Sequence, residues 1–296
     1  GSILITGAGG VLGLGLAQAA PAGAGLGLAG RRRPGFWPAS ARFHPVDLAV
    51  PGQLADLVGA LRPAVVLHAA AVTRVGAAEA DPALCRRVNV EAVVELVAAA
   101  AGVGARVLLV STDMVFAGDR ESYQEQDLPD AASVYGRSKA DAEARVLAAG
   151  HAVARLPLLL GGRAGPGRCG ADTALLSALA AGERPVLYGD EWRAPIAAEL
   201  AAEVLFDLLG RLATSELEAG GVFHIGGCEP VDRHRLGLRV CSAAKAPPAF
   251  DFALAAELAP ERPRRLILRC DRARWELGWR APDLRQSLAR RFPTAP

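Results

Sequence analysis

The sequence is poor in the features that mark metal-binding, disulfide-rich and nucleic-acid-binding proteins. Its 5 cysteines are scattered, and no two of them form a Cys-x-x-Cys pair. We therefore expect reduced, buried or incidental thiols in a cytoplasmic protein, with neither a disulfide framework nor a metal site. The formal net charge of +2 gives no argument for binding to nucleic acid or to an anionic membrane.

Lysine is nearly absent, and long unbroken apolar segments are missing. Lys139 and Lys245 are the only lysines. Residues 2–30 carry no charge, and Ala17-Gln18-Ala19 resembles a signal-peptidase site, but no basic segment precedes it and Pro21 and many glycines interrupt the apolar run. We expect neither a signal peptide nor a membrane span. We interpret Gly1-Ser2 as the residue of a cleaved fusion tag.

The first half of the sequence does contain a regular alternation of strand-like and helix-like segments. Hydrophobic residues make up 51% of the 296 residues, which is enough for a large core. The alternation predicts an α/β fold with a parallel, doubly wound (Rossmann) sheet. The expected strands are residues 3–6, 25–29, 43–48, 64–68, 106–110 and 152–156. In such sheets, ligands bind at the carboxyl ends of the strands.

The regular alternation stops near residue 161. We therefore divide the chain into a dinucleotide-binding Rossmann domain, residues 1–160, and a smaller C-terminal α/β part, residues 161–296. We expect the second part mainly to bind substrate and partly to pack back on the Rossmann core. Its first ten residues, 161–170, are rich in Gly, Arg and Pro and are predicted to form a loop.

A glycine-rich turn follows the first strand directly. Residues 6–13 are Thr-Gly-Ala-Gly-Gly-Val-Leu-Gly, and a helix-like segment comes next. Glycines between a strand and a helix permit a tight turn and let the backbone approach a pyrophosphate, and the N–H groups of the helix start point at it. A flexible linker is the alternative interpretation. The predicted dinucleotide contacts in this turn are Gly7, Gly10, Val11, Leu12 and Gly13.

The end of the second strand carries arginines where NAD-preferring sites commonly carry a carboxylate. Gly30 is followed by Arg31-Arg32-Arg33 and by no acid. Guanidinium groups suit the 2′-phosphate of NADP, because they form paired, charge-assisted hydrogen bonds with it. Arg31 and Arg32 therefore favour NADP over NAD, and a solvated basic loop is the alternative.

Other polar and small residues also fall at the ends of expected strands. They are Asp47 after the third strand, Ala69, Ala70 and Ala71 after the fourth, and Ser111 and Thr112 after the fifth. Because the carboxyl ends of parallel strands lie at one edge of a sheet, one cleft could hold all of them together with the glycine turn.

Tyr135 and Lys139 stand four residues apart in a segment that is predicted to be helical to about residue 149. On a helix, such residues share a face, so the phenol and the ammonium can point into one site. A nearby cation would lower the pKa of the tyrosine from its ordinary value of about 10, as a proton donor near neutral pH requires. Taken alone, this spacing also arises by chance in many helices.

Together, these motifs resemble the extended short-chain dehydrogenase/reductase superfamily. Its T-G-x-x-G-x-x-G and Y-x-x-x-K patterns match residues 6–13 and 135–139. Within the superfamily, the chain is most similar to the dTDP-4-dehydrorhamnose reductase group. Residues 111–118, Ser-Thr-Asp-Met-Val-Phe-Ala-Gly, match that group's S-T-D-Y-V-F-D-G segment with Met114 in place of Tyr. Further similar segments are residues 68–75, 78–82, 88–89 and 189–195, and Arg262-Pro263.

The resemblance implies a role for each matching residue. Thr112, with Ser111 beside it, would hydrogen-bond the carbonyl oxygen of the substrate. Tyr135 would donate the proton as hydride arrives from the nicotinamide, and Lys139 would hold the nicotinamide ribose. Both residues would thus also bind the cofactor. The other implied contacts are Asp47 and Leu48 at the adenine, Ala69, Ala70 and Ala71 along the cofactor, Thr73, Val75 and Met114 at the sugar, and Arg193 and Trp192, with Tyr188, at the nucleotide part of a substrate. Arg193 and Trp192 could equally be packed or solvated side chains.

The implied activity is the NADPH-dependent reduction of a carbonyl compound, a nucleotide-linked 4-keto-6-deoxysugar. Sugar-nucleotide dehydratases carry Glu where this chain has Met114, so the second carboxylate for dehydration is missing. We can match no acidic residues to a divalent ion and predict no metal. Two alternatives remain: a sugar-nucleotide epimerase, and a non-catalytic NADP-binding regulatory subunit like that of methionine adenosyltransferase. Members of the superfamily are often dimers, so we also expect a homodimer.

Overall fold

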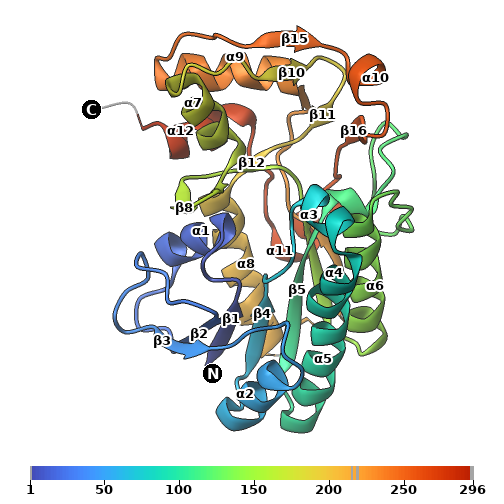
Figure 1. The fold of residues 1–296 in the computed structure, drawn as a ribbon. Helices are drawn as coiled ribbons and strands as arrows, with labels where there is room; N and C mark the ends of the chain where they lie inside the picture. Colours follow the sequence, from blue (N-terminus) through green and yellow to red (C-terminus); the bar gives the residue numbers. More distant parts are fainter. Residues whose placement is uncertain (1, 215, 218–219, 294–296) are drawn as a thin grey trace.

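The main sheet of the protein has seven parallel strands in the part of the chain that the computed structural model describes, residues 2–214, 216–217 and 220–293 (Figure 1). Gly1, interpreted above as part of a tag, lies outside the described residues, as do residues 294–296. The chain starts in the middle of the sheet and moves outward first to one edge and then to the other. In spatial order the strands are β13 (Gly221–His224), β6 (Ala152–Leu156), β5 (Arg106–Thr112), β4 (Val65–His68), β1 (Ile3–Thr6), β2 (Leu26–Gly30) and β3 (Arg42–Pro45). This order confirms the predicted doubly wound Rossmann sheet.

Helices cover both faces of the sheet, because neighbouring residues of each strand point to opposite sides. In β1, Ile5 packs with Leu16 and Leu205 on one face, whereas Leu4 packs with Leu96 on the other. The first face carries α1 (Val11–Ala19) and α8 (Ala198–Ala213), and the second carries α2 (Gln53–Leu61), α5 (Ala92–Val103) and α6 (Val134–Ala148).

The helix predicted from residue 82 to about 101 is present but interrupted. Asp81 caps its start, as predicted, by accepting a hydrogen bond from the Leu84 N–H over 2.9 Å. A π-helical turn, Arg87–Glu91, then separates α4 (Pro82–Arg86) from α5. The short helix α3 (Val75–Ala80) before it was not predicted. π-Turns of this kind often present a side chain to a functional site.

The C-terminal part has much shorter strands, and most of its elements lie above the main sheet in Figure 1. Its paired strands are β10 (Val186–Tyr188) with β15 (Asp251–Ala253), and β14 (Val231–Asp232) with β11 (Trp192–Arg193) and β16 (Arg265–Leu266). In addition, β12 (Ile196–Ala197) pairs with β7 (Leu159–Leu160), which comes just before residue 161. Its helices are α7 (Ala171–Ala180), α9 (Arg233–Ala244), α10 (Ala255–Leu258), α11 (Asp271–Leu277) and α12 (Leu284–Arg291).

Two features bear on the predicted division at residue 161. First, β13 extends the main sheet and α8 packs on α1, so later segments do return to the Rossmann core. Second, residues 161–170 were predicted to form a loop, and this prediction was wrong. They contain an antiparallel hairpin of β8 (Arg163–Gly165) and β9 (Arg168–Cys169).

No helix in the described part of the chain is long and apolar enough to cross a membrane.

Candidate active site

The glycine turn joins β1 to α1 with a backbone that admits no larger side chains at two positions. Gly7 has φ of +72°, and a Cβ on it would lie 2.5 Å from the Ala69 carbonyl carbon. A Cβ on Gly13 would lie 2.3 Å from the Ala8 carbonyl oxygen. Gly10 precedes α1 and offers no side-chain cap to its first N–H groups. These N–H groups at Val11 and Leu12 can therefore bind an anion, so the turn fits a dinucleotide pyrophosphate.

The segment after β4 lies directly against this turn. The Thr6 hydroxyl oxygen accepts hydrogen bonds from the Ala69 and Ala70 N–H groups, each over 3.2 Å. It also bonds to His68 Nδ1 at 3.1 Å. Burial lowers the pKa of His68 to about 3, so the ring is neutral at physiological pH. Ala69, Ala70 and, next in the chain, Ala71 thus line the same edge as the glycines.

The predicted adenosine contacts lie at the ends of β2 and β3. Arg31 and Arg32 are exposed, and neither has a hydrogen bond or ion pair to another described residue. Arg33 differs, because its guanidinium donates to the Ala41 and Pro38 carbonyl oxygens over 2.8 and 2.9 Å. Only the first two arginines of the run therefore present unengaged guanidinium groups.

Asp47, the other predicted adenosine contact, uses one carboxylate oxygen within its own turn. Asp47 Oδ1 accepts from the Ala49 N–H over 3.0 Å. Leu48 next to it packs partly against the core under α2 and α5.

Tyr135 and Lys139 both lie on the buried face of α6, as predicted. Ser133 caps this helix by accepting from the Gly136 N–H over 3.0 Å. A Cβ on Gly136 would lie 2.2 Å from the Met114 carbonyl oxygen. The start of α6 can therefore pack closely on the segment after β5, which brings Tyr135 next to Thr112.

The pKa of Tyr135 contradicts one expectation from the sequence. Burial raises this pKa above its ordinary value, the Thr112 hydroxyl lowers it in part, and Asp113 and Cys85 raise it further. Lys139 is not among the groups that shift this pKa, and its ammonium donates to the Val110 carbonyl oxygen over 2.7 Å. The phenol is therefore held in its protonated form.

Lys139 is almost completely buried, with 3% of its surface exposed. Burial lowers its pKa to about 8, and the Glu143 carboxylate one helical turn further on partly offsets this effect. Its single ammonium–carbonyl hydrogen bond leaves it capacity for further acceptors.

Thr112 ends β5, where its hydroxyl group takes part in two local contacts. It donates to Asp113 Oδ1 and accepts from the Met114 N–H, each over 3.2 Å. Ser111 beside it is buried, and its hydroxyl has no hydrogen-bond partner among the described residues. The predicted carbonyl-binding pair is therefore present at the same strand end as Tyr135.

Two further residues belong to this cluster and were missed as site residues. Asn89 on the π-turn bonds to the Val72 backbone through both its amide oxygen and its amide nitrogen, over 2.8 and 3.1 Å. It also donates to the Ser138 hydroxyl over 2.9 Å, and so ties the segment after β4 to α6. The Val-Asn pair in the family-like stretch was the available signal.

Asp113 is the second missed residue. Its carboxyl is 4% exposed, and Oδ2 is buried without a hydrogen-bond partner among the described residues. Burial raises its pKa to about 6, against the lowering effects of Arg193 and of the Thr112 hydrogen bond. Its position directly after Thr112 was noted in the sequence, but its burial could not be read there.

The predicted sugar contacts divide into two groups. Val75 and Met114 pack in one apolar cluster with Tyr135, so they lie beside the phenol. Thr73, by contrast, is exposed.

Arg193 lies inside the C-terminal part instead of presenting a free guanidinium. It is 6% exposed, and it donates to the Trp192 and Pro263 carbonyl oxygens over 2.7 and 3.0 Å. It also forms an ion pair with Glu191 at 3.2 Å. These contacts leave little of Arg193 for a substrate phosphate, and its charge acts on Asp113.

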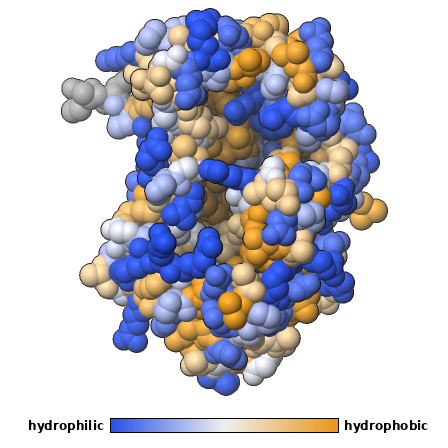
Figure 2. Space-filling view, in the orientation of Figure 1, coloured by the Kyte–Doolittle hydropathy of each residue, from blue (hydrophilic) through white to orange (hydrophobic). Residues whose placement is uncertain are grey.

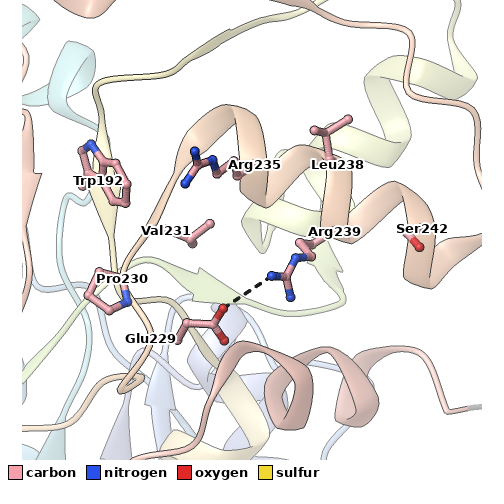
Figure 3. A pocket seen from close by; sticks show the side chains of 8 residues that line it. All are labelled: Trp192, Glu229, Pro230, Val231, Arg235, Leu238, Arg239 and Ser242. Carbon is pink, nitrogen blue, oxygen red and sulfur yellow. Dashed lines mark ion pairs between the residues drawn. The ribbon is translucent and has the colours of Figure 1, made fainter.

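Trp192 lines a separate pocket of about 370 Å³ between β11 and α9 (Figure 3). Neighbouring strand residues point to opposite faces, so the indole faces away from buried Arg193. Arg235 and Arg239 also line the pocket, and Arg239 pairs with Glu229 at 3.7 Å. The two predicted nucleotide contacts, Arg193 and Trp192, are therefore not brought into one site.

The surface is hollowed between the Rossmann part and the C-terminal part, and both hydrophilic and hydrophobic residues border this hollow (Figure 2). No group of three or more His, Cys, Asp or Glu residues that could hold a metal ion occurs in the described part of the chain. The polar groups gathered at the carboxyl edge of the sheet are Ser111, Thr112, Tyr135 and Lys139.

The sheet, the glycine turn and this cluster define an extended short-chain dehydrogenase/reductase. The sequence matches the family described as "RmlD substrate binding domain" over residues 1–294. The chain belongs to this family.

Individual relatives carry different names. The chain is 36% identical over 129 residues to methionine adenosyltransferase 2 subunit beta of Pongo abelii, a match that spans 43% of this chain and 39% of the relative. It is 34% identical over 184 residues to dTDP-4-dehydrorhamnose reductase of Salmonella typhimurium, over 60% of this chain and 59% of the relative. These matches thus span about two to three fifths of the length of the curated relatives.

A solved structure matches over nearly the whole chain. The structure described as a hypothetical dTDP-4-dehydrorhamnose reductase from Sulfolobus tokodaii has a TM-score of 0.77 and 26% identity, over 93% of this chain and 94% of that chain. This likeness agrees with the Rossmann architecture described above.

Proposed function

We propose that this chain is an NADPH-dependent reductase of a nucleotide-linked 4-keto-6-deoxysugar or a closely related carbonyl compound. The observation that carries the proposal is the meeting of Thr112, Tyr135 and Lys139 at the strand edge that also holds the glycine turn. Membership of the family and the dTDP-4-dehydrorhamnose reductase relative support the sugar-nucleotide substrate.

In this proposal each residue has one role at the carbonyl oxygen or beside it. NADPH would supply the hydride. The Thr112 hydroxyl would turn its single proton from Asp113 to the carbonyl oxygen, and Ser111 could hydrogen-bond this oxygen as a neighbour. Tyr135 would give its proton to the same oxygen, and its raised pKa keeps that proton on the phenol until negative charge develops there. Lys139 would bind the nicotinamide ribose hydroxyls with its remaining donors.

The cofactor preference rests on Arg31 and Arg32. Both guanidinium groups are exposed at the end of β2, where the adenosine ribose lies in Rossmann sites, and no acid follows that strand. They would bind the 2′-phosphate, with Asp47 and Leu48 nearer the adenine and Ala69, Ala70 and Ala71 along the cofactor.

Reduction is favoured over dehydration because the cluster offers one carboxyl group and not two. Asp113 is buried and hydrogen-bonded to Thr112, and the following residue, Met114, is apolar. A dehydration needs additional acid and base groups at the sugar. We propose that Val75 and Met114, which pack beside Tyr135, contact the sugar, whereas Arg193 positions Asp113. Residues 161–296 would form most of the substrate-binding part.

The test is to follow NADPH oxidation with a panel of keto-sugar nucleotides that includes dTDP-4-keto-6-deoxysugars. We expect turnover by the natural chain and a loss of about 10²–10⁴-fold in Tyr135→Phe, the usual contribution of a positioned general acid. NADPH affinity should change little in this variant. Full activity of Tyr135→Phe would show that the phenol is not the proton donor.

A regulatory subunit is the second candidate, because the chain shares 36% identity over 129 residues with methionine adenosyltransferase 2 subunit beta. Absence of turnover with every sugar nucleotide, together with a stable complex with a methionine adenosyltransferase catalytic subunit, would favour it. A tightly retained oxidised cofactor without NADPH turnover would favour an epimerase instead.

The scattered cysteines support a cytoplasmic location for the protein. For its assembly, we expect a homodimer.

A further inference from the structure

The β8–β9 hairpin, the segment predicted to be a loop, lies against the start of α1 (Figure 1). The residues just before the hairpin pack very closely on α1. A Cβ on Gly161 would lie 2.5 Å from Val11 Cγ1, and a Cβ on Gly162 would lie 3.1 Å from Leu14 Cδ2. Glycine at these two positions therefore allows a segment of the C-terminal part to reach the glycine turn of the Rossmann part.

The Arg168 side chain extends from this hairpin over the turn. Its Nη1 lies 3.5 Å from the position that a Cβ on Gly9 would occupy. The side chain also folds back across Gly165, whose Cβ position would be 2.8 Å from Nη2. The Arg168 side chain makes no hydrogen bond or ion pair with any other described residue. The Arg168 guanidinium thus lies over the turn, and its N–H groups make no hydrogen bond to another described residue.

The glycine turn supplies less positive charge than a bound pyrophosphate would need, and a guanidinium group could supply the rest. Residues 2–30 contain no charged side chain. The start of α1 contributes the equivalent of roughly half a positive charge, whereas a dinucleotide pyrophosphate carries about two negative charges. Arginine is well suited to the remainder, because its planar fork can bond two phosphate oxygens at once.

We propose that Arg168 is a pyrophosphate-binding residue that the C-terminal hairpin supplies to the dinucleotide site. The inference rests on the proposed function, since it requires a dinucleotide at the glycine turn. It adds a contact from outside the Rossmann part. The β8–β9 hairpin, residues 163–169, would then lie across the cofactor, and we call it the strap.

Arg74 positions this strap from the opposite side. It follows β4, and its Nη2 donates a hydrogen bond to the Gly167 carbonyl oxygen. Gly167 has φ of +64° and sits next to Arg168, at a point where a Cβ would be 2.7 Å from Arg74 Nη2. Arg74 thus joins the segment after β4 to the tip of the hairpin and fixes where Arg168 points.

The experiment measures binding by isothermal titration of the full chain with three probes: NADPH, NADH and adenosine 2′-monophosphate, which has no pyrophosphate. In Arg168→Ala we expect the Kd values of NADPH and NADH to rise by the same factor, roughly tenfold, because each loses one charge-assisted contact. The Kd of adenosine 2′-monophosphate should not change. Arg163→Ala is the matched control, because Arg163 lies on the same hairpin but bonds to the Ser177 hydroxyl.

The outcomes separate the inference from the proposed function. If the natural chain binds both dinucleotides and Arg168→Ala binds them equally well, the inference is wrong and the proposed function stands. An equal loss for adenosine 2′-monophosphate would also overturn the inference, since it would indicate general damage to the site. If the natural chain binds neither dinucleotide, the proposed function and the inference both fail.

The role of Arg74 has its own readout. Arg74→Ala should weaken NADH binding in the natural background, because the strap loses its anchor. It should have no further effect in an Arg168→Ala background, because the group that it positions is already gone. Equal effects in both backgrounds would mean that Arg74 acts independently of Arg168.

Discussion

The Rossmann part and the C-terminal part are stabilised in different ways. In the Rossmann part, every residue of β4 and of β6 is buried, and mostly apolar strands form the core. In the C-terminal part, β11, β14 and β16 have two residues each, and buried charged side chains contribute to holding the short strands beside small apolar clusters. Glu191, for example, is 4% exposed and pairs with both Arg193 and Arg262.

This difference matters for where function can be recognised. A long buried strand places the residue after it at a known edge, so Thr112 and Ala69 could be assigned to the site from order alone. In a network of short strands, the donors of an arginine can instead already be bonded to carbonyl groups and carboxylates, as those of Arg193 are. A charged residue is thus a weaker sign of a ligand in the second part than in the first.

The largest expected effect tests the exception to this contrast, a buried ion pair inside the Rossmann part. Arg155 donates to Glu143 through Nε and Nη2, over 3.0 and 2.7 Å, and both side chains are 2% exposed. Arg155→Ala would remove the hydrogen-bonded partner of the buried Glu143 carboxylate, which costs about 3–5 kcal/mol in the free energy of unfolding. Urea denaturation measures this loss.

Arg145→Ala is the matched control, because Arg145 lies on α6 near Glu143 but is exposed. A double replacement of Arg155 and Glu143 by Met should recover much of the loss, since it removes both charges. A loss under about 1 kcal/mol in Arg155→Ala would mean that apolar packing alone maintains this region.

The next effect depends on pH and concerns Asp113. Its folded pKa of about 6 lies above the ordinary value of 3.8, so the folded chain binds this proton more tightly than the unfolded chain. The carboxyl therefore lowers the stability of the natural chain as pH rises from about 4 through 6, by up to about 3 kcal/mol. Asp113→Asn should lack this loss.

Unfolding free energies of both chains, measured at pH 4.5 and at pH 7.5, check this expectation. The difference should shift in favour of Asp113→Asn at the higher pH. Asp141→Asn, with its carboxyl exposed on α6, reports the pH effects that any acid-to-amide change brings. A pH-independent difference between Asp113→Asn and the natural chain would contradict the raised pKa.

The same contrast explains how much could be predicted from the sequence. The parallel sheet, the glycine turn and the Tyr135–Lys139 face follow from apolar runs and from the helical period, which are local signals. The raised pKa of Tyr135, the π-turn under Asn89 and the burial of Asp113 depend on which distant segments pack there. Strands of two or three residues give no clear periodic signal, so the hairpin before Gly170 could not be distinguished from a loop.

A third, smaller effect compares two arginines of one loop. Arg31→Ala should raise the Kd of NADPH roughly tenfold and leave that of NADH unchanged, because only NADPH has the 2′-phosphate. Arg33→Ala should change neither, because Arg33 bonds to the Ala41 and Pro38 carbonyl oxygens. Fluorescence titration with the two dinucleotides measures both. An equal loss of NADPH and NADH affinity in Arg31→Ala would show that Arg31 does not read the 2′-phosphate.

The smallest effect is expected from Arg290, at the end of α12. Arg290 pairs with Glu203, and both side chains are about half exposed, at 51% and 48%. Such surface pairs contribute about 0–1 kcal/mol, because water screens them and the side chains lose freedom. Arg290→Ala should therefore change the midpoint of urea denaturation little.

Arg291 makes the informative comparison, because it joins the two parts of the molecule. It bonds to Asp172 of α7 and to Glu199 of α8, each over 2.9 Å, and the Asp172 side chain is fully buried. Arg291→Ala leaves that carboxylate without its cation, so we expect a loss of about 1–3 kcal/mol. If the two variants lost equal stability, the buried charged contacts of the C-terminal part would stabilise it no more than exposed ion pairs do. Its short strands would then have to be held by apolar packing, as the Rossmann strands are.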